Sequence, residues 1–429
     1  MPLAQEYRLL DGKNISTIIQ KTLNYVDARL VDHGKRVSYL VMKMAEELEC
    51  YSEDEIKEIA FLALLHDIGA YKTEEIDDMV NFETTNIWEH SIYGYLFIKY
   101  LSPISRWAPA VLFHHISYNQ MDGTEECAQI AQIINIADRA DVFLENDKSI
   151  DKLMQLLEDS RGSRFSDEAV DLFAAAQEKH NMIGAILSPG SLTPAFPTLE
   201  LTRQSTTAFV KMLICIIDFR SRHTLTHTIT TTVISKETAS VMNLSEETTA
   251  KLTCGAMLHD LGKIGIPLEI LEFSGKLSPQ AMKIMRTHVD ITEKILDDCL
   301  DDEIVQIALR HHEKLDGSGY PKGLTAKELK LSERILAVSD IVSALVGVRS
   351  YKGAFSKEKT LGIIQKMAQN GYIDPEVVQT ITDHFDDIIK TVRKQSAPFT
   401  EVYEKINAEY QQLIEKYKTG HNPVISTAY

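Results

Sequence analysis

The chain has 429 residues, 44% of them hydrophobic, which is enough for two or three domains with real cores. Its net charge of −17 argues against a broad surface for a nucleic-acid polymer, although a small anionic ligand is compatible with it. The five cysteines are scattered, which indicates reduced thiols in a cytoplasmic protein rather than a disulfide or zinc framework. The N-terminus does not resemble a signal peptide, and the longest apolar runs are too short for membrane insertion.

The first half of the sequence predicts one helix after another. Apolar residues at helical spacing run from Ile15 to Glu49, and the pair Ser52 and Glu55 is typical of a capping box at the start of the next helix. That helix runs into the motif His66-Asp67-Ile68-Gly69. Later helices carry side chains able to bind metal, namely His90, His114, His115 and Asp138. Ser166 caps one further helix.

Prolines and glycines from Ser188 to Pro197 interrupt the helical pattern, and we expect the domain boundary there. The expected domains are residues 1–190 and 191–429. The alternation from Thr198 to Thr206 allows a short strand.

The second half returns to helices. Ile214 to Val241 is predicted to be helical and includes His227, and Ser245 caps a helix that ends in His259-Asp260-Leu261-Gly262-Lys263. Later helices carry further side chains of the same kind, namely His288, His311, His312 and Asp340. Residues 399–417 are predicted to form a closing amphipathic helix.

The two halves place the same residue types in the same order. His227 follows His33 by 194 residues, and Asp340 follows Asp138 by 202. The offset grows only where the second half has extra residues, around Lys263 to Pro267 and around Gly317 to Pro321. We infer an internal duplication, and hence an all-α fold of two tandem helical domains.

Imidazoles and carboxylates at these positions are typical of a dinuclear metal centre. Because Asp260 directly follows His259, the histidine can bind one ion while the carboxylate spans two ions about 4 Å apart. Such a pair binds a phosphodiester and activates water, and Lys263 is within reach of a phosphate oxygen. A single histidine is more often a packing or surface residue, but seven matched positions in two copies favour ligands.

The segment from Asp218 to about Phe385 resembles an HD-GYP domain, a branch of the HD phosphohydrolase superfamily. The matching residues are His227, the run from His259 to Pro267, His288, His311-His312-Glu313, the run from Gly317 to Pro321, and Asp340. The resemblance implies an all-α domain with two, sometimes three, metal ions. Family members hydrolyse cyclic dinucleotides, chiefly cyclic di-GMP and in some cases 3′3′-cGAMP, to linear dinucleotides or mononucleotides.

The resemblance also implies roles for individual residues. The expected catalytic residues are Asp260 and Lys263. The expected metal ligands are His227, His259, Asp260, His288, His311, His312 and Asp340. The expected substrate-binding residues are Lys263, Gly319, Tyr320, Pro321, Arg349 and Lys352. The expected cofactor is a pair of divalent ions, iron or manganese, with zinc or nickel as alternatives.

The chain departs from the family pattern in two runs. Arg349-Ser350-Tyr351-Lys352 replaces the usual Arg-Pro-Tyr-Arg, and Ser343-Ala344-Leu345-Val346 replaces Asp-Ala-Leu-Thr. Both changes leave the ligands intact but bear on substrate preference. His223, one turn before His227, is a candidate ligand for a third ion, and packing is its simpler role.

The segment from Asp32 to Ala176 resembles a plain, degenerate HD domain. Its candidate metal ligands are His33, His66, Asp67, His90, His114, His115 and Asp138. Ala70 stands where the second copy has Lys263, Lys72 is out of register, and Ile116-Ser117-Tyr118-Asn119 replaces the Gly-Tyr-Pro lip. We expect this copy to serve either as structural support or as a regulatory or ligand-binding domain.

The sequence thus predicts a metal-dependent cyclic-dinucleotide phosphodiesterase whose partner is its substrate, and it allows a homodimer. One alternative is an HD-type nucleotidase or dNTP hydrolase, against which the Gly-Tyr-Pro turn argues. The other is a non-catalytic cyclic-dinucleotide receptor, against which the complete ligand set argues.

Overall fold

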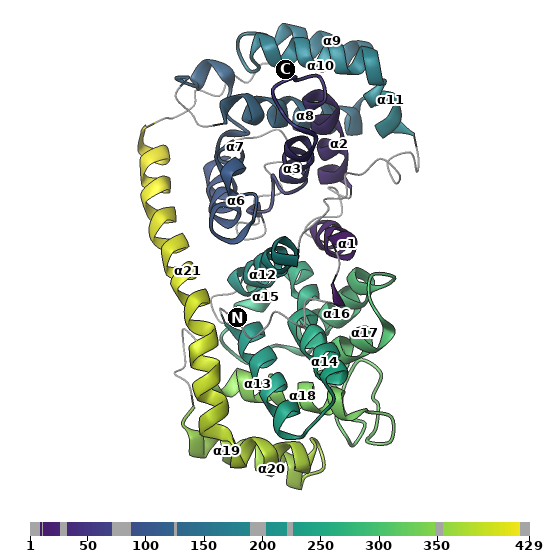
Figure 1. The fold of residues 1–429 in the computed structure, drawn as a ribbon, viewed down its shortest axis with the longest axis vertical. Coiled ribbons are helices and arrows are strands. Elements are labelled where there is room, and N and C mark those ends of the chain that lie inside the picture. The colour runs from purple at the N-terminus through teal and green to yellow at the C-terminus, as the bar shows by residue number, and fades with distance from the viewer. Residues whose placement is uncertain are drawn as a thin grey trace. The chain divides into compact units, whose positions relative to one another are not determined.

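The structure, a computed structural model, describes residues 9–10, 12–25, 32–70, 87–123, 127–188, 203–220, 226–347 and 355–420. Within these ranges the ordered elements are helices, joined by turns and two isolated β-bridges (Figure 1). The all-α prediction is therefore confirmed. Among the described helices, none combines the length and the apolar character that crossing a membrane requires.

The chain divides into two compact units. The N-terminal unit comprises residues 26–201 and 405–429, and the C-terminal unit comprises residues 1–25 and 202–404. Each terminal segment therefore packs in the unit that holds the opposite half of the chain. The domains expected at 1–190 and 191–429 remain a prediction, and the packing differs from that division at both ends.

The N-terminal unit is built from helices that carry the first set of candidate ligands. Its elements are α2 (His33–Ala45), α3 (Glu53–Leu64), α6 (Ile87–Leu101), η3 (Ser105–Trp107), α7 (Ala108–Phe113), η4 (Tyr118–Gln120), α8 (Ala128–Asn146), α9 (Ile150–Asp159), α10 (Asp167–His180) and α11 (Met182–Leu187). Helix α2 packs on α3 and α8, and α7 packs on α6 and α8. The predicted capping box of Ser52 and Glu55 begins α3, and Ser166 caps α10.

The C-terminal unit repeats this arrangement with the second set. Its elements are α1 (Gly12–Leu23), α12 (Arg203–Arg220), α13 (His227–Val241), α14 (Glu246–Leu258), η5 (Leu261–Gly265), α15 (Leu268–Leu271), α16 (Pro279–Leu296), α17 (Asp302–Leu309), α18 (Leu331–Val346), α19 (Lys357–Gln369), α20 (Pro375–Asp383) and the first part of α21 (Phe385–Gly420). Helix α13 packs on α14 and α18, as α2 packs on α3 and α8.

Helix α1 belongs to the C-terminal unit, where it lies beside α12 and α16 (Figure 1). Ile15, Ile18 and Ile19 form its buried face. Lys21 Nζ donates to the carbonyl oxygen of Asp297 at 2.6 Å, beyond the end of α16. The buried isoleucines and this hydrogen bond explain why α1 packs in the C-terminal unit, although the N-terminal unit follows α1 in sequence.

The end of α21 packs in the N-terminal unit. Tyr410 stacks on Tyr93 with ring centroids 4.1 Å apart, and Glu409 accepts from Lys99 at 2.6 Å. The sequence predicted a closing helix from Phe399, but α21 begins at Phe385 and continues through Pro398. The helix is continuous through Pro398, although an interior proline removes one N–H donor and its ring crowds the carbonyl four residues earlier.

Two stretches read as continuously helical each contain two helices. Residues 15–49 hold α1 and α2, and residues 214–241 hold the end of α12 and all of α13. His33 and His227 are the first residues of α2 and α13, so each lies at a helix start. The strand allowed at 198–206 is wrong over residues 203–206, which begin α12, and its remainder lies outside the described residues.

Candidate metal centres

The structure brings the seven expected ligands of the C-terminal unit together from five places. His227 begins α13, and His259 and Asp260 follow the end of α14. The other four come from α16, the turn after α17, and α18; they are His288, His311, His312 and Asp340. Two groups of nitrogen and oxygen atoms, His227 with His259 and Asp260, and His288 with His311 and His312, each lie within 4.8 Å of one another.

Asp260 stands between these two groups. Its Oδ2 lies 3.4 Å from His227 Nε2 and 3.1 Å from His259 Nε2. Its Oδ1 lies 3.6 Å from His288 Nε2 and 3.9 Å from His311 Nε2. One carboxylate thus presents a different oxygen to each histidine group, which is the geometry that a bridging ligand between two ions requires.

Asp340 also lies near His227 and His259. Its Oδ1 is 3.0 Å from His227 Nε2 and 3.7 Å from His259 Nε2, and its Oδ2 is 3.9 Å from His312 Nδ1. It is therefore placed to add a second carboxylate to the centre.

The backbone orients most of these rings. The Nδ1 atoms of His259, His288 and His311 lie 2.6–2.7 Å from the carbonyl oxygens three residues earlier. His66 and His114 make the same contact in the N-terminal unit, at 2.7 and 2.6 Å. Each Nδ1 can donate only if it carries the proton, so in the neutral ring Nε2 is the acceptor that faces the centre.

A glycine after each His-Asp pair lets another helix approach. Gly262 lies against the backbone of His288, and Gly69 lies against that of His90. A Cβ atom at either glycine would overlap the histidine's carbonyl oxygen. The missing side chain therefore lets the helix with the third histidine reach the centre.

Charge is divided unevenly across the C-terminal centre. Burial alone would lower the pKa of His259, but Asp260 raises it to about 10. Burial alone would raise the pKa of Asp260, but His259 and Lys263 hold it well below its ordinary value. Burial lowers the pKa of His312 to about 3. His259 thus holds a proton that a metal ion would displace, whereas His312 is already neutral.

Lys263 lies at the same carboxylate. Its Nζ donates to Oδ2 of Asp260, and its side chain is 19% exposed. Burial opposes its charge, but Asp260 outweighs burial and raises the pKa of Lys263. The lysine therefore stays positively charged at the edge of the centre.

The Gly-Tyr-Pro lip covers this centre. The ring centroid of Tyr320 lies 4.6 Å from that of His312, and the guanidinium carbon of Arg286 lies 4.7 Å from the Tyr320 centroid. Gly319 is pressed against the backbone of Glu313 and Lys314, where a Cβ atom would collide. The sequence reading missed Arg286, which precedes the ligand His288 by two residues in an ordinary helical pattern.

Glu313 holds the lip in place. Its Oε1 accepts from the backbone N–H of Lys322 at 2.7 Å and of Gly323 at 3.1 Å, and its Oε2 accepts from that of Leu324 at 2.9 Å. The side chain is buried. Three backbone donors on one carboxylate make the segment after Pro321 a fixed loop.

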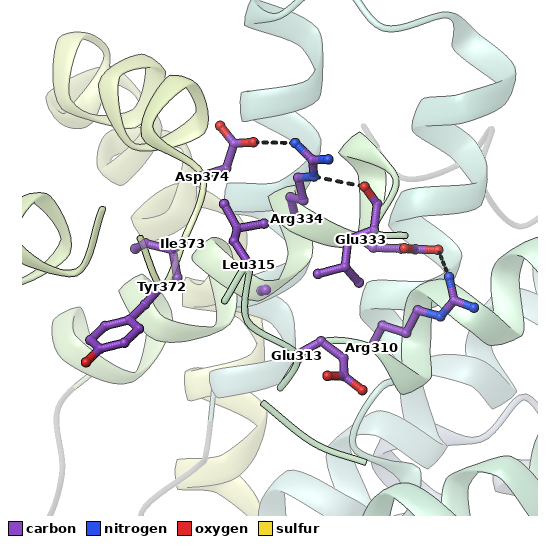
Figure 2. A pocket seen from close by; sticks show the side chains of 10 residues that line it. Arg310, Glu313, Leu315, Glu333, Arg334, Tyr372, Ile373 and Asp374 are labelled. Carbon is purple, nitrogen blue, oxygen red and sulfur yellow. Dashed lines mark hydrogen bonds and ion pairs between the residues drawn. The ribbon is translucent and has the colours of Figure 1, made fainter. Parts of the chain in front are cut away.

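Two hollows lie near the lip, and neither suits a nucleotide. One, of about 10 Å³, is crossed by the ion pairs Arg310–Glu333 and Arg334–Asp374 and has room for about one water molecule (Figure 2). The other, of about 200 Å³, is lined by several carboxylates, namely Glu293, Asp297, Asp298, Asp302 and Glu313. These five carboxylates outnumber the two cations of the same lining, Arg310 and Lys322, and their negative charge would repel phosphate groups.

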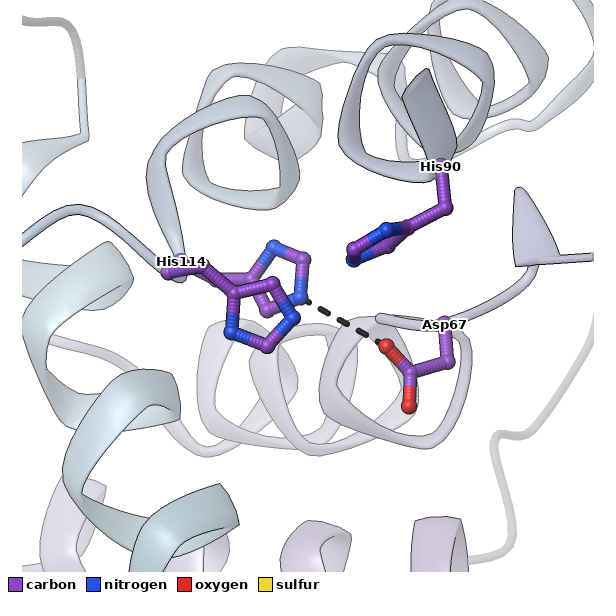
Figure 3. Close-up of side chains that lie close together, drawn as sticks. Asp67, His90 and His114 are labelled. Carbon is purple, nitrogen blue, oxygen red and sulfur yellow. Dashed lines mark ion pairs between the residues drawn. The ribbon is translucent and has the colours of Figure 1, made fainter. Parts of the chain in front are cut away.

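The N-terminal unit assembles a second centre from the matching residues. Asp67 Oδ2 lies 3.1 Å from His66 Nε2 and 3.8 Å from His33 Nε2, and its Oδ1 lies 3.5 Å from His114 Nε2. Figure 3 shows Asp67 facing His90 and His114. The ligand groups here are His33 with His66 and Asp138, and Asp67 with His90, His114 and His115. All seven candidates therefore come together in this copy as well.

The first histidine of each copy has a different supporting partner. His33 Nδ1 lies 2.7 Å from Oδ2 of Asp141, which is itself held by Arg36 Nε at 2.6 Å. His227 Nδ1 lies 3.0 Å from the hydroxyl of Ser343, the residue that matches Asp141. Burial would lower the pKa of His33, but Asp138 and Asp141 raise it to about 10.

Both centres fit divalent ions. Among the described residues, buried atoms without a hydrogen-bond partner gather here: Nε2 of His66, His114 and His259, and Oδ1 of Asp67 and Asp260. Such atoms are costly unless something binds them. Imidazole and carboxylate donors are the set that iron, manganese and zinc accept. Among the residues named from the sequence, Lys72, His223 and the run from Arg349 to Lys352 lie outside the described residues.

Comparison with known proteins agrees with this arrangement. Residues 30–142 and residues 211–377 each match a family model of the HD domain. The chain therefore belongs to the HD-domain family and carries two such domains in tandem.

Its relatives are phosphodiesterases. The 3′3′-cGAMP-specific phosphodiesterase 1 of Vibrio cholerae is 26% identical over 389 residues, which cover 85% of this chain and 89% of the relative. A cyclic di-GMP phosphodiesterase of Thermotoga maritima is 35% identical over 190 residues, or 43% of this chain and 51% of the relative. These relatives confirm the resemblance to HD-GYP phosphodiesterases.

A solved structure shares the fold. The crystal structure of a cyclic GMP-AMP-specific phosphodiesterase of Vibrio cholerae aligns with a TM-score of 0.56 at 20% identity, covering 87% of this chain and 97% of that chain. At this identity the likeness concerns the arrangement of helices.

Proposed function

We propose that this protein is a metal-dependent phosphodiesterase that hydrolyses cyclic dinucleotides at its C-terminal centre. The observation that carries the proposal is Asp260, whose two oxygens face two histidine groups beneath the Gly-Tyr-Pro lip. The names of the relatives supply the substrate class, cyclic di-GMP or 3′3′-cGAMP. The expected products are the linear dinucleotide or mononucleotides.

The proposed cofactor is a pair of divalent ions, iron or manganese, with zinc or nickel as alternatives. His227, His259, His288, His311, His312, Asp260 and Asp340 would hold them. When bound, the ions supply Lewis acidity and lower the pKa of the attacking water.

The chain's own residues would orient and neutralise the substrate. Lys263 stays charged beside Asp260, within reach of a phosphate oxygen. Tyr320, which contacts both His312 and Arg286, lines the lip, and Arg286 adds a positive charge at the mouth. The fixed lip would position one phosphodiester over the centre.

A direct assay separates this proposal from its alternatives. The purified chain, loaded with manganese or with iron under reducing conditions, is incubated with cyclic di-GMP, 3′3′-cGAMP and a set of dNTPs. Cleavage of a cyclic dinucleotide is expected. Hydrolysis of dNTPs alone would indicate a nucleotidase, and tight binding of a cyclic dinucleotide without cleavage would indicate a receptor. Light scattering on the same samples tests the homodimer that the sequence allows.

A further inference from the structure

Arg139 lies at the N-terminal centre on the side of Asp138, and the turn that carries Arg164 docks beside that centre. Arg139 follows Asp138 on α8, and its side chain is 6% exposed. Its Nη2 lies 3.4 Å from His115 Nδ1, and its Nε lies 3.7 Å from Asp138 Oδ2. The matching residue of the second copy is Ile341, so the C-terminal centre has no cation at this position.

Arg164 belongs to the turn between α9 and α10. The carbonyl oxygen of Arg164 accepts from the N–H of Tyr118, and that of Ser163 accepts from the N–H of Asn119, both at 2.9 Å. Tyr118 and Asn119 belong to the four residues that stand in place of the Gly-Tyr-Pro lip. The turn with Arg164 is therefore docked where the other copy carries its lip.

Gln132 on α8 fixes this docking. Its Nε2 donates to the carbonyl oxygen of Ile116 at 3.1 Å, and its Oε1 accepts from the N–H of Ser166 at 3.1 Å. Asn135 donates to the same carbonyl at 3.0 Å. The side chain of Arg164 is half-buried, and the charges of Arg139 and Asp138 both act on it.

Metal ions in this centre would leave positive charge in excess. Two divalent ions carry more charge than Asp67 and Asp138 together, and Arg139 and Arg164 add to the excess. The third carboxylate, Asp141, is already bonded to Arg36 and His33. Guanidinium groups beside metal ions suit the oxygens of a phosphate group, which they bind through paired hydrogen bonds.

We propose that the N-terminal centre is a second ligand site, which binds the phosphate group of a small ligand through two metal ions and the side chains of Arg139 and Arg164. This site does not depend on the C-terminal centre. It replaces the lysine and the lip of the catalytic copy by two arginines that recognise the phosphate itself.

The test uses the full chain with His259→Ala and Asp260→Ala, so that phosphate binding reports the N-terminal centre. Manganese content is measured first, and inorganic phosphate is then titrated by calorimetry. Arg164→Gln should weaken phosphate binding roughly tenfold with unchanged metal content. Arg139→Gln should weaken it at least as much.

A matched control lies on the same turn. Arg161 pairs with Glu158 and Asp171 rather than with the centre, so Arg161→Gln should bind phosphate like the parent chain. Melting temperatures identify variants that fail to fold. If Arg139→Gln fails to fold, Arg164→Gln still tests the proposal, because Arg164 is only half-buried.

Competition distinguishes free phosphate from a phosphate ester. GMP and a linear dinucleotide with a 5′-phosphate are titrated with and without inorganic phosphate. If an ester is the ligand, it binds more tightly than phosphate and loses affinity in the same two variants. The proposal is overturned if the centre binds no manganese, if it binds manganese but no phosphate compound, or if Arg164→Gln matches Arg161→Gln.

Discussion

The hydroxyl of Ser343 lies 3.0 Å from Nδ1 of His227, where the N-terminal copy sets the carboxylate of Asp141 against His33 at 2.7 Å. When a carboxylate accepts a hydrogen bond from Nδ1, the ring nitrogen that faces away from the ion, the imidazole is a stronger metal ligand than when a hydroxyl accepts it. The two centres therefore differ in how firmly their first histidine is supported.

This difference predicts unequal effects on metal binding. Asp141→Ala should cost roughly 10–100-fold in metal affinity at the N-terminal centre. Ser343→Ala should cost only a few-fold at the C-terminal centre, because a neutral partner is lost. Competition with a fluorescent chelator measures both. Equal losses in the two variants would contradict this account of the supporting partners.

The second prediction separates metal binding from rate. Asp260→Ala should lose metal and nearly all hydrolysis together, because the carboxylate that faces both histidine groups is removed. Lys263→Ala should keep metal but lose rate, because its proposed partner is the substrate phosphate. Metal content and kcat are measured for both, with Lys251→Ala, a lysine paired with Glu303, as the control. Loss of metal in Lys263→Ala would show that the lysine mainly supports Asp260.

Much of this fold followed from local sequence. The caps at Ser52, Ser166 and Ser245 begin helices as expected, because these signals act within one turn. The seven matched positions indicated two centres, and the structure assembles the same residues in each unit.

Other features depend on contacts between distant residues. Arg139 and Arg164 are 25 positions apart, and only the docking of the α9–α10 turn brings the second to the centre. The place of α1 in the C-terminal unit depends on isoleucines that look the same in any amphipathic helix. Neither could be predicted from spacing.

The third prediction concerns the lip. Glu313→Ala removes the acceptor for three backbone N–H groups, so the loop after Pro321 should loosen. We expect a higher KM, a several-fold lower kcat/KM and unchanged metal content. Glu328→Ala is the control, because Glu328 accepts from Thr325 in the same loop and is exposed. A normal KM in Glu313→Ala would show that the lip does not position the substrate.

The fourth prediction concerns pH and metal removal. The pKa of His259 is raised to about 10, so its contribution to the stability of the chelated protein is full below its ordinary pKa of 6.5. That contribution is lost as the pH rises toward 10. The pKa of His33 is also raised to about 10 and acts in the same direction.

Bound metal ions need neutral imidazoles and replace these protons. The stability of the metal-loaded protein should therefore not fall with rising pH for this reason. Melting temperatures from pH 6.5 to 10, with and without EDTA, should diverge as the pH rises. Parallel curves would mean that the histidines do not hold protons in the chelated protein.

The last prediction concerns the division of labour between the two centres. Both assemble a full ligand set, but only the C-terminal centre has Lys263 and the Gly-Tyr-Pro lip. Metal binding needs the ligands alone, whereas fast phosphodiester cleavage also needs positioning and charge neutralisation. His66→Ala with Asp67→Ala should therefore leave most cyclic-dinucleotide hydrolysis intact.

The matched comparison is His259→Ala with Asp260→Ala, which should abolish hydrolysis. Steady-state kinetics, metal content and melting temperature are recorded for both double variants. Any loss of activity in the N-terminal variant should follow its stability, because the buried His66 and the half-buried Asp67 are packed among other ligands. If that variant is folded and keeps its C-terminal metal but is inactive, the N-terminal centre takes part in catalysis. In that case Lys263 and the Gly-Tyr-Pro lip of the second copy are not sufficient for hydrolysis.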